Sequence, residues 1–159
     1  MNAAVEDARL AAALWECDRH RAALDEALAD WHARPPPSVD ALEADPVLRR
    51  LTDQILYRFT KLQDAMGERL VPATLSWLQE LHESWPMRDR LDRLEKLGYL
   101  DVDAWLRWRD VGNRLAHEYP GAADQRHAAV LATVAAVTAM LQALAAWKAR
   151  LPLLPTGSV

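Results

Sequence analysis

The sequence has 159 residues, of which 51% are hydrophobic and 26% are charged, and its formal net charge at pH 7 is −4. This length and this proportion of hydrophobic to charged residues predict one folded domain over residues 1–150 with a flexible tail over 151–159. The same proportion excludes a disordered chain. The acidic balance disfavours a general nucleic-acid binder, because such binding depends on neutralising phosphates. Any contact with RNA must therefore come from a local cluster of cations.

The single cysteine, Cys17, excludes a disulfide within the chain and a zinc site built from cysteines. The N-terminal segment has neither the basic nor the apolar region of a signal peptide. We also expect no apolar run that reaches the roughly 18 residues of a membrane span. These features predict a cytoplasmic protein that does not enter a membrane.

Alanine, leucine, arginine and glutamate dominate the sequence, and only five residues are glycine. Because these four residues favour helices, we expect an all-α, up-and-down bundle of about five helices. The first helix is expected at 2–33 and ends before the prolines at 35–37, since proline lacks an amide donor. The second is expected to begin at a cap, Ser38 or Asp40, and to carry an apolar stripe over 48–66.

The middle of the chain contains several helix-breaking residues. A break or kink is expected between Gly67 and Pro72, after which a helical stripe continues to Leu81. A short helix over 87–97 is expected to end at Gly98, which can adopt the backbone conformation of a C-cap.

Two further helices complete the expected bundle. The first of them is capped by Asp101 or Asp103 and closes at the Pro-Gly pair 120–121. The last is expected at 122–150. Its buried seam is formed by aliphatic residues, namely Val130, Val134, Val137, Leu141 and Leu144.

The segment 113–120 carries side chains suited to phosphodiester chemistry. Arg114 and His117 are three residues apart and share a helix face. A histidine exchanges protons near neutral pH, and an arginine offers a planar fork of donors to phosphate, so together they suit cleavage without a metal. Asp110 and Asn113 could orient either partner, and Arg109 lies about two helical turns before the histidine.

Simpler roles remain open for the same residues. The arginines can form surface ion pairs, and His117 can complement the dipole of its helix. Gly112 either allows a close approach of another backbone or is tolerated at a cost of about 1 kcal/mol. Arg58 and Lys61 could face a shared cleft or a solvated helix edge. We find no spacing typical of a metal site, and we expect no cofactor.

The run 109–120, Arg-Asp-Val-Gly-Asn-Arg-Leu-Ala-His-Glu-Tyr-Pro, resembles the signature of the HEPN superfamily. Within it, the run is most similar to the HepT-like toxins that pair with minimal nucleotidyltransferase (MNT) antitoxins. Their signature is an arginine, a polar residue, three further residues, histidine, any residue and tyrosine. Segments 57–67 and 93–98 add to a likeness that spans roughly residues 45–145.

The resemblance implies a helical protein that forms a homodimer and brings two copies of the motif together. It also implies a toxin of a type II or type VII toxin–antitoxin pair that acts as a metal-independent endoribonuclease. His117 would then exchange a proton with the ribose 2′-hydroxyl, and Arg109 or Arg114 would stabilise charge on the phosphate. Tyr119 matches the tyrosine that the nucleotidyltransferase modifies with AMP in some relatives.

One position departs from the signature. Gly112 stands where the family has its arginine. This departure and the acidic charge favour an alternative, a catalytically silent HEPN subunit that binds or regulates a nucleotidyltransferase. Asn113, His117 and Tyr119 favour the ribonuclease. A plain helical adaptor is the third interpretation.

Overall fold

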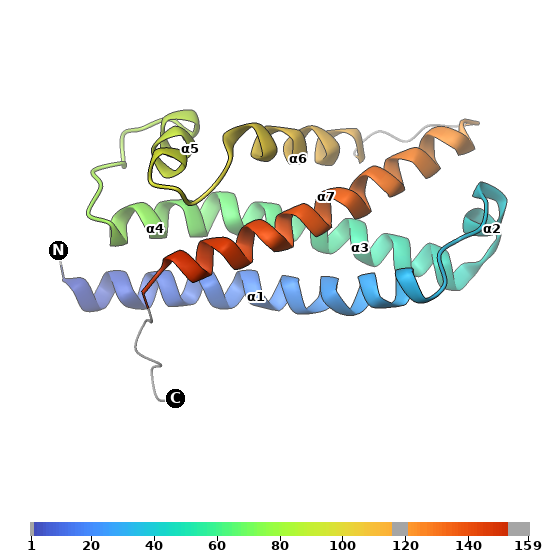
Figure 1. The fold of residues 1–159 in the computed structure, drawn as a ribbon, viewed down its shortest axis with the longest axis horizontal. Helices are drawn as coiled ribbons and strands as arrows, with labels where there is room; N and C mark the ends of the chain where they lie inside the picture. The colour runs from blue at the N-terminus through green and yellow to red at the C-terminus, as the bar shows by residue number, and fades with distance from the viewer. Residues whose placement is uncertain (1, 116–120, 153–159) are drawn as a thin grey trace.

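The computed structural model describes residues 2–115 and 121–152, and all regular structure within those ranges is helical. The helices lie side by side in an elongated bundle (Figure 1). The expected all-α bundle is therefore confirmed, but the chain is divided differently. In chain order the elements are α1 Ala3–Ala33, α2 Val39–Ala44, α3 Pro46–Ala65, the π-helical segment η1 Met66–Leu70, α4 Val71–Trp77, α5 Met87–Lys96, α6 Val102–Leu115 and α7 Ala123–Arg150.

Three long rods form the body of the bundle. The continuous rod of α3, η1 and α4 runs alongside α1, and α7 crosses the same bundle obliquely (Figure 1). Helix α6 packs on both α3 and α7, and α5 connects α4 to α6. The end of α6, which leads into the predicted motif, is thereby held between α3 and α7.

The second expected helix is in fact two helices. The side chain of Ser38 accepts a hydrogen bond from the amide of Ala41 at 3.1 Å and starts α2. A second cap follows, because Asp45 Oδ1 accepts from the amide of Val47 at 2.8 Å and Pro46 occupies the first turn of α3. Proline needs no amide partner at that position, so the Asp-Pro pair begins a new helix.

Of the break or kink expected between Gly67 and Pro72, the break is wrong, because the chain stays helical through this segment; the α-helix is instead replaced there by the π-helical turns of η1. Helix α4 ends at Trp77, and Gln79 has a φ of 62°. The expected stripe is therefore wrong at Leu81, which lies in the loop and is 78% exposed.

Two expected helix boundaries are confirmed. Gly98 follows α5 with a φ of 83°, as a C-cap glycine does. Asp101 is the cap of α6, because its Oδ1 accepts from the amide of Ala104 at 3.0 Å. Asp103 instead lies within the first turn of that helix.

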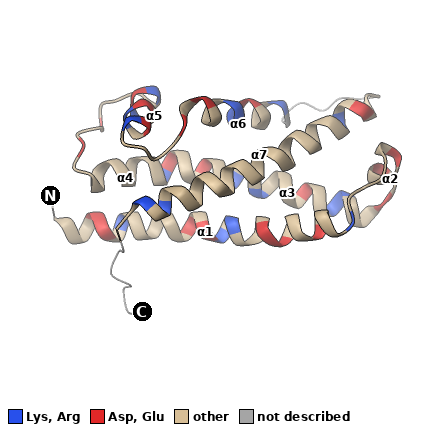
Figure 2. Cartoon of the chain, in the orientation of Figure 1, with Lys and Arg blue, Asp and Glu red and all other residues tan. Residues whose placement is uncertain are grey.

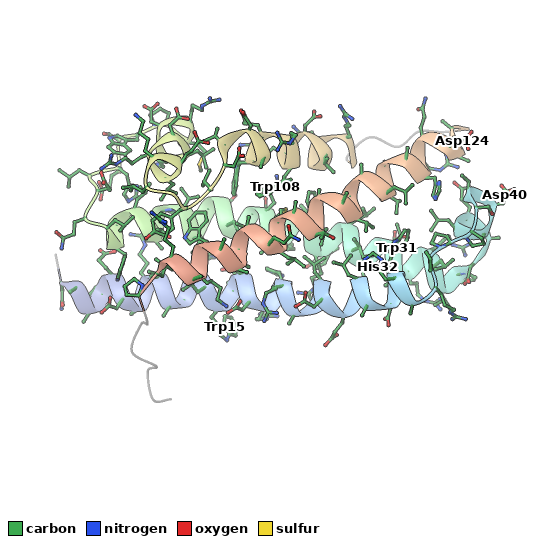
Figure 3. The ribbon with its side chains drawn as sticks, in the orientation of Figure 1. Trp15, Trp31, His32, Asp40, Trp108 and Asp124 are labelled. Carbon is green, nitrogen blue, oxygen red and sulfur yellow. The ribbon has the colours of Figure 1, made fainter. Side chains whose placement is uncertain are left out.

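The core contains large apolar side chains from every long helix. Phe59, Met140 and Trp147 are fully buried, and Trp31, Trp105 and Trp108 are also buried in the core. Cys17 is also buried, and burial raises the pKa of its thiol to about 12. Trp15 is an exception, because it lies on the outer side of α1 (Figure 3) and is 63% exposed.

Helix α7 corrects the expectation that the chain has no long apolar run. Its most apolar window of 18 residues has a mean hydropathy of 2.0, which meets the length and composition of a membrane span. The core helix of a soluble protein meets the same criterion, and Val137, Met140, Leu144 and Trp147 of α7 are fully buried against the bundle. The criterion is therefore weak evidence for a membrane protein.

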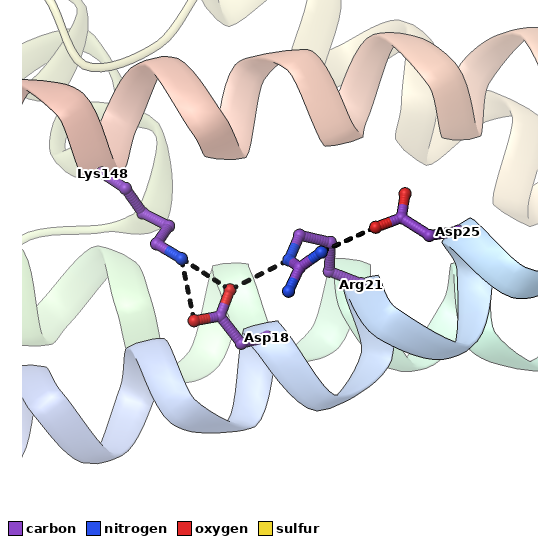
Figure 4. A network of polar contacts seen from close by, with 4 residues as sticks. All are labelled: Asp18, Arg21, Asp25 and Lys148. Carbon is purple, nitrogen blue, oxygen red and sulfur yellow. Dashed lines mark hydrogen bonds and ion pairs between the residues drawn. The ribbon is translucent and has the colours of Figure 1, made fainter.

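A polar network ties the C-terminal end of α7 to α1 (Figure 4). The ammonium of Lys148 lies 2.8 Å from both carboxylate oxygens of Asp18. Arg21 lies between Asp18 and Asp25, at 3.2 Å from the first and 2.6 Å from the second. Arg21, which interrupts the apolar stripe of α1 in the sequence, is thus satisfied at the edge of the core.

Candidate functional site

The described part of the predicted site occupies the last two turns of α6. Arg109, Asp110, Asn113 and Arg114 are all exposed there. Nη2 of Arg114 lies 2.9 Å from Oδ2 of Asp110, one turn earlier on the same helix. Two further predicted residues, His117 and Tyr119, fall within residues 116–120 and so lie outside the described residues; their roles stay predictions.

The two candidate arginines differ in their surroundings. Arg109 and Arg114 are five residues apart, which separates them by about 140° around a helix. Arg114 faces α7, where it lines a surface depression of about 390 Å³ together with Val111, Gln125, Ala128, Ala129 and Ala132. Arg109 does not line this depression. Of the two arginines, Arg114 is the one that borders this depression.

Gly112 lies directly against α3. A Cβ built on Gly112 would stand 2.9 Å from Oε1 of Gln63 and 3.6 Å from Cε1 of Phe59. The atoms nearest to this Cβ belong to side chains of α3 and not to another backbone, so the space at Gly112 is limited by the flexible end of Gln63. An arginine at this position could enter only if the flexible Gln63 side chain moved. Nε2 of Gln63 is buried without a hydrogen-bond partner.

Arg58 and Lys61 do not lie on the side of α3 that contacts Gly112 of α6. Nη1 of Arg58 is 3.1 Å from Nδ1 of His20 on α1, and burial, followed by the nearby Arg58, lowers the pKa of that histidine. The guanidinium of Arg58 and the ammonium of Lys61 lie 5.7 Å and 5.6 Å from the ring of Tyr57. Both cations thus lie beside the same aromatic ring. Gly112 of α6 is close to different residues of α3, namely Phe59 and Gln63, so the structure does not bring Arg58 and Lys61 to the motif at Gly112.

A buried serine–histidine pair was not anticipated from the sequence. Oγ of Ser76 lies 2.8 Å from Nε2 of His82, and both residues are buried. Arg9 donates to the same hydroxyl at 3.4 Å. The pair resembles part of a nucleophilic site, but burial closes it to substrate, so its role is to join α1, α4 and the following loop. The six-residue separation across a helix end gave no signal in the sequence.

Within residues 2–115 and 121–152, no group of three or more His, Cys, Asp or Glu side chains is placed to hold a metal ion. Comparison with protein families, curated proteins and solved structures gives no match to this chain. The features of this chain that bear on function are therefore the residues at the end of α6 and their resemblance to a known motif.

Proposed function

We propose that this protein is the ribonuclease toxin of a toxin–antitoxin pair, of the HEPN type, and that Arg114 is its phosphate-binding arginine. The observation that carries the proposal is the position of Arg114: it is exposed, lies three residues before His117, and lines the depression between α6 and α7. The other arginine of the predicted site, Arg109, lines no part of it.

The proposed reaction requires a base, an acid and a group that stabilises the phosphorane-like transition state. His117 removes the proton from the 2′-hydroxyl, whose oxygen attacks the adjacent phosphorus while the bond to the 5′-oxygen breaks and that oxygen takes up a proton from water, which serves as the acid. Arg114 donates hydrogen bonds to the phosphate oxygens as negative charge gathers on them. The products are a 2′,3′-cyclic phosphate and a 5′-hydroxyl end.

Asp110 has a supporting role in this proposal. Its carboxylate holds the Arg114 guanidinium at 2.9 Å, which restricts the long side chain before substrate binds. Because both groups are largely exposed, this ion pair is weak enough for phosphate to compete with the carboxylate. Asn113, exposed on the same turn, is available to donate to the ribose or the phosphate.

The partner in this proposal is a minimal nucleotidyltransferase that silences the toxin by attaching AMP to Tyr119. The added phosphate would bring a bulky negative charge close to the phosphate-binding arginine and exclude RNA by size and repulsion. Mass spectrometry after co-expression with a nucleotidyltransferase tests this directly. An unmodified Tyr119 in the presence of ATP would refute it.

The decisive experiment incubates purified protein with RNA in EDTA and analyses the cleaved ends. The wild type should leave 2′,3′-cyclic phosphates, His117→Ala should remove cleavage, and Arg114→Ala should reduce it by about 10²–10³-fold. Arg107→Ala is the matched control, because Arg107 is also exposed on α6. If Arg109→Ala lost cleavage to this extent and Arg114→Ala retained it, the phosphate-binding role would belong to Arg109.

A second function is favoured by Gly112. A glycine packed against Gln63 leaves the family's arginine position without a cation, as expected for a silent HEPN subunit that only binds a nucleotidyltransferase. RNA that stays intact with the wild type, together with a tight complex with the nucleotidyltransferase, would support this function and refute the ribonuclease.

A further inference from the structure

Three cations on the helices α1 and α3 have no acidic partner. Within the described ranges, Arg19, Arg58 and Lys61 form no ion pair, whereas Arg21 and Arg69 nearby are each held by a carboxylate. Figure 2 shows Lys and Arg interspersed with Asp and Glu along both helices, so neither helix has an extended basic face. The cations open to an anionic ligand are therefore the few that no carboxylate already neutralises.

Two of these cations surround an aromatic ring on α3. The guanidinium of Arg58 lies 5.7 Å from the centre of the Tyr57 ring, and the ammonium of Lys61 lies 5.6 Å from it. A cation over an exposed ring is held weakly, because water screens the attraction. A phosphate can therefore draw both cations away from the ring.

The third cation continues the same surface on α1. The guanidinium of Arg19 lies 5.2 Å from the ring centre of Trp15. His20, the next residue, joins the two helices, because its Nδ1 lies 3.1 Å from Nη1 of Arg58. A guanidinium can only donate, so the imidazole accepts and carries no charge of its own. We call the residues linked in this way the cationic strip: Trp15, Arg19, His20, Tyr57, Arg58 and Lys61.

Both aromatic rings of the strip are open to solvent. Trp15 is 63% exposed and Tyr57 is 56% exposed, and Trp15 lies on the outer side of α1 (Figure 3). Four other tryptophans are buried in the core, namely Trp31, Trp105, Trp108 and Trp147. The two exposed rings add little to the core, but their faces are available to another planar group.

We propose that the cationic strip binds single-stranded nucleic acid. Its phosphates would contact Arg19, Arg58 and Lys61, and its bases would stack on Tyr57 and Trp15. Cations that follow the backbone, combined with rings on which bases stack, bind single strands with little regard to sequence. The strip also supplies the local cluster of cations that a chain with a net charge of −4 needs in order to contact RNA.

Other anionic partners use only part of the strip. An acidic peptide would neutralise the cations but leave both rings exposed. The bases of a duplex are already stacked on one another, so they cannot stack on the rings. A helix that lies in a membrane interface presents a continuous apolar face, whereas the two rings here are flanked by Arg19 and Lys61.

Acidic residues limit the strip without neutralising it. Glu16 lies one turn before His20, but Nε of Arg69 holds its carboxylate at 2.8 Å. Asp64 is exposed three residues beyond Lys61 and forms no ion pair in the described part of the chain. A nucleic-acid strand should therefore cross from α3 to α1 and not continue along α3 towards Asp64.

The strip is separate from the site at the end of α6. Tyr57 precedes Phe59, which lies beside Gly112, by two residues, and this places it about 160° away around α3. The proposal therefore goes beyond the proposed ribonuclease and does not depend on it. A DNA strand is a suitable probe, because it lacks the 2′-hydroxyl that the proposed cleavage requires.

Fluorescence anisotropy with a labelled single strand of oligothymidine tests the cations. With three phosphate contacts, the logarithm of the binding constant should fall with the logarithm of the salt concentration with a slope of about −2. Lys61→Gln should weaken binding about fivefold at about 0.1 M salt and reduce the slope by about 0.7, whereas Lys61→Arg should bind as the wild type does. Lys96→Gln is the matched control, because Lys96 is exposed on α5, which contacts neither α1 nor α3.

Replacement of the ring tests the stacking. Tyr57→Leu should weaken binding about tenfold without changing the salt slope, and Tyr57→Phe should retain binding because the ring, not the hydroxyl, stacks on the base. Leu106→Ala, which shortens an exposed apolar side chain of α6, should have no effect. Circular dichroism should be the same for all variants, since each change is made at an exposed position.

The pKa of His20 reports whether an anion occupies the strip. Burial lowers this pKa, and the charge of Arg58 lowers it further. A phosphate beside Arg58 offsets that charge, so the pKa of His20 should rise when oligothymidine is added, as an NMR titration measures. The pKa of the buried His82 should stay unchanged. A shift of His82 alone, or no shift of His20 at saturation, would place the ligand elsewhere.

Competition identifies the class of ligand. Polyglutamate, duplex DNA and anionic lipid vesicles, each at the same concentration of charge, should displace little of the bound oligothymidine. Equal or tighter binding of any of them would overturn the assignment, as would binding that Lys61→Gln and Tyr57→Leu leave unchanged. A protein that cleaves RNA but does not bind oligothymidine would refute the strip and leave the role of Arg114 standing.

Discussion

Gly112 of α6 lies beside Gln63 of α3: a Cβ on the glycine would stand 2.9 Å from Oε1 of the glutamine. That distance is shorter than ordinary contact, so a larger residue at position 112 requires the flexible end of Gln63 to move. Gly112 is also the position at which the chain departs from the HEPN signature that it resembles. The cost of a larger side chain there is therefore set by how easily Gln63 moves.

The Gly112–Gln63 contact predicts a coupling in stability. Alanine is favoured over glycine within a helix by about 1 kcal/mol, but in the wild type the contact with Gln63 should offset most of this gain. In a Gln63→Ala background, Gly112→Ala should therefore be more stabilising, by about 0.5–1 kcal/mol. Urea unfolding of the four proteins of the cycle measures the coupling. Strictly additive effects would refute the contact.

Cys17 predicts a loss of stability at alkaline pH. Its thiol pKa is raised from 9.0 to about 12 by burial, so above pH 9 the unfolded chain releases a proton that the folded chain retains. Stability should then fall by at most about 1.4 kcal/mol per pH unit, and Cys17→Ala should remove that part of the slope. Thermal unfolding from pH 8 to 10.5 checks this. A thiol reagent should label Cys17 only in denaturant; rapid labelling of the folded protein would contradict its burial.

His82 predicts a loss of stability at acidic pH. Its pKa is lowered from 6.5, first by burial and then by Arg90, so below about pH 6.5 the unfolded chain binds a proton that the folded chain rejects. Stability should decline as the pH falls through this range, and His82→Gln should flatten the decline. His20→Gln is the matched comparison, because the pKa of His20 is also lowered. A slope that His82→Gln does not change would show that the imidazole is not buried as described.

The Asp18–Lys148 ion pair predicts a modest, salt-dependent link between α1 and α7. Both side chains are about one-third exposed, at 33% and 38%, so water weakens their attraction. A cycle of Asp18→Asn and Lys148→Met should give a coupling of about 0.5 kcal/mol at low salt, and less at 1 M salt. Arg88 and Asp92, a more exposed pair on α5, should couple no more strongly. A coupling that is independent of salt would contradict an electrostatic link.

Much of the helical framework could be predicted because its signals are local. Gly98 and Asp101 mark helix ends through their own backbone and side-chain chemistry, and both were identified from the sequence. The start of α3 at Asp45 and Pro46 was missed, because the apolar stripe beyond it also fits a helix that begins earlier. Leu81 was misplaced for the same reason, since periodicity alone does not reveal the turn at Gln79.

The candidate site could be predicted only in part. The exposed positions of Asn113 and Arg114 follow from helix periodicity, but the choice between Arg109 and Arg114 depends on where α7 packs. The contact of Gln63 with Gly112 joins residues 49 positions apart and has no local signal. The absence of charged residues over 127–147 is visible in the sequence, but only the packed bundle separates the buried face of α7 from its exposed face.

The π-helical segment Met66–Leu70 marks a place where the chain length can change. A π turn holds one more residue than an α turn, so deletion of a single residue there can restore a regular helix without breaking the rod. Such a deletion would leave α4 close to its present orientation relative to α3, because the π turn and the α turn that replaces it cover about the same rotation. Trp77 would then keep its position beside Asp7, to which its indole donates at 2.9 Å. A homologue shorter by one residue in this turn should therefore need no compensating changes in α4 or at the N-terminal end of α1.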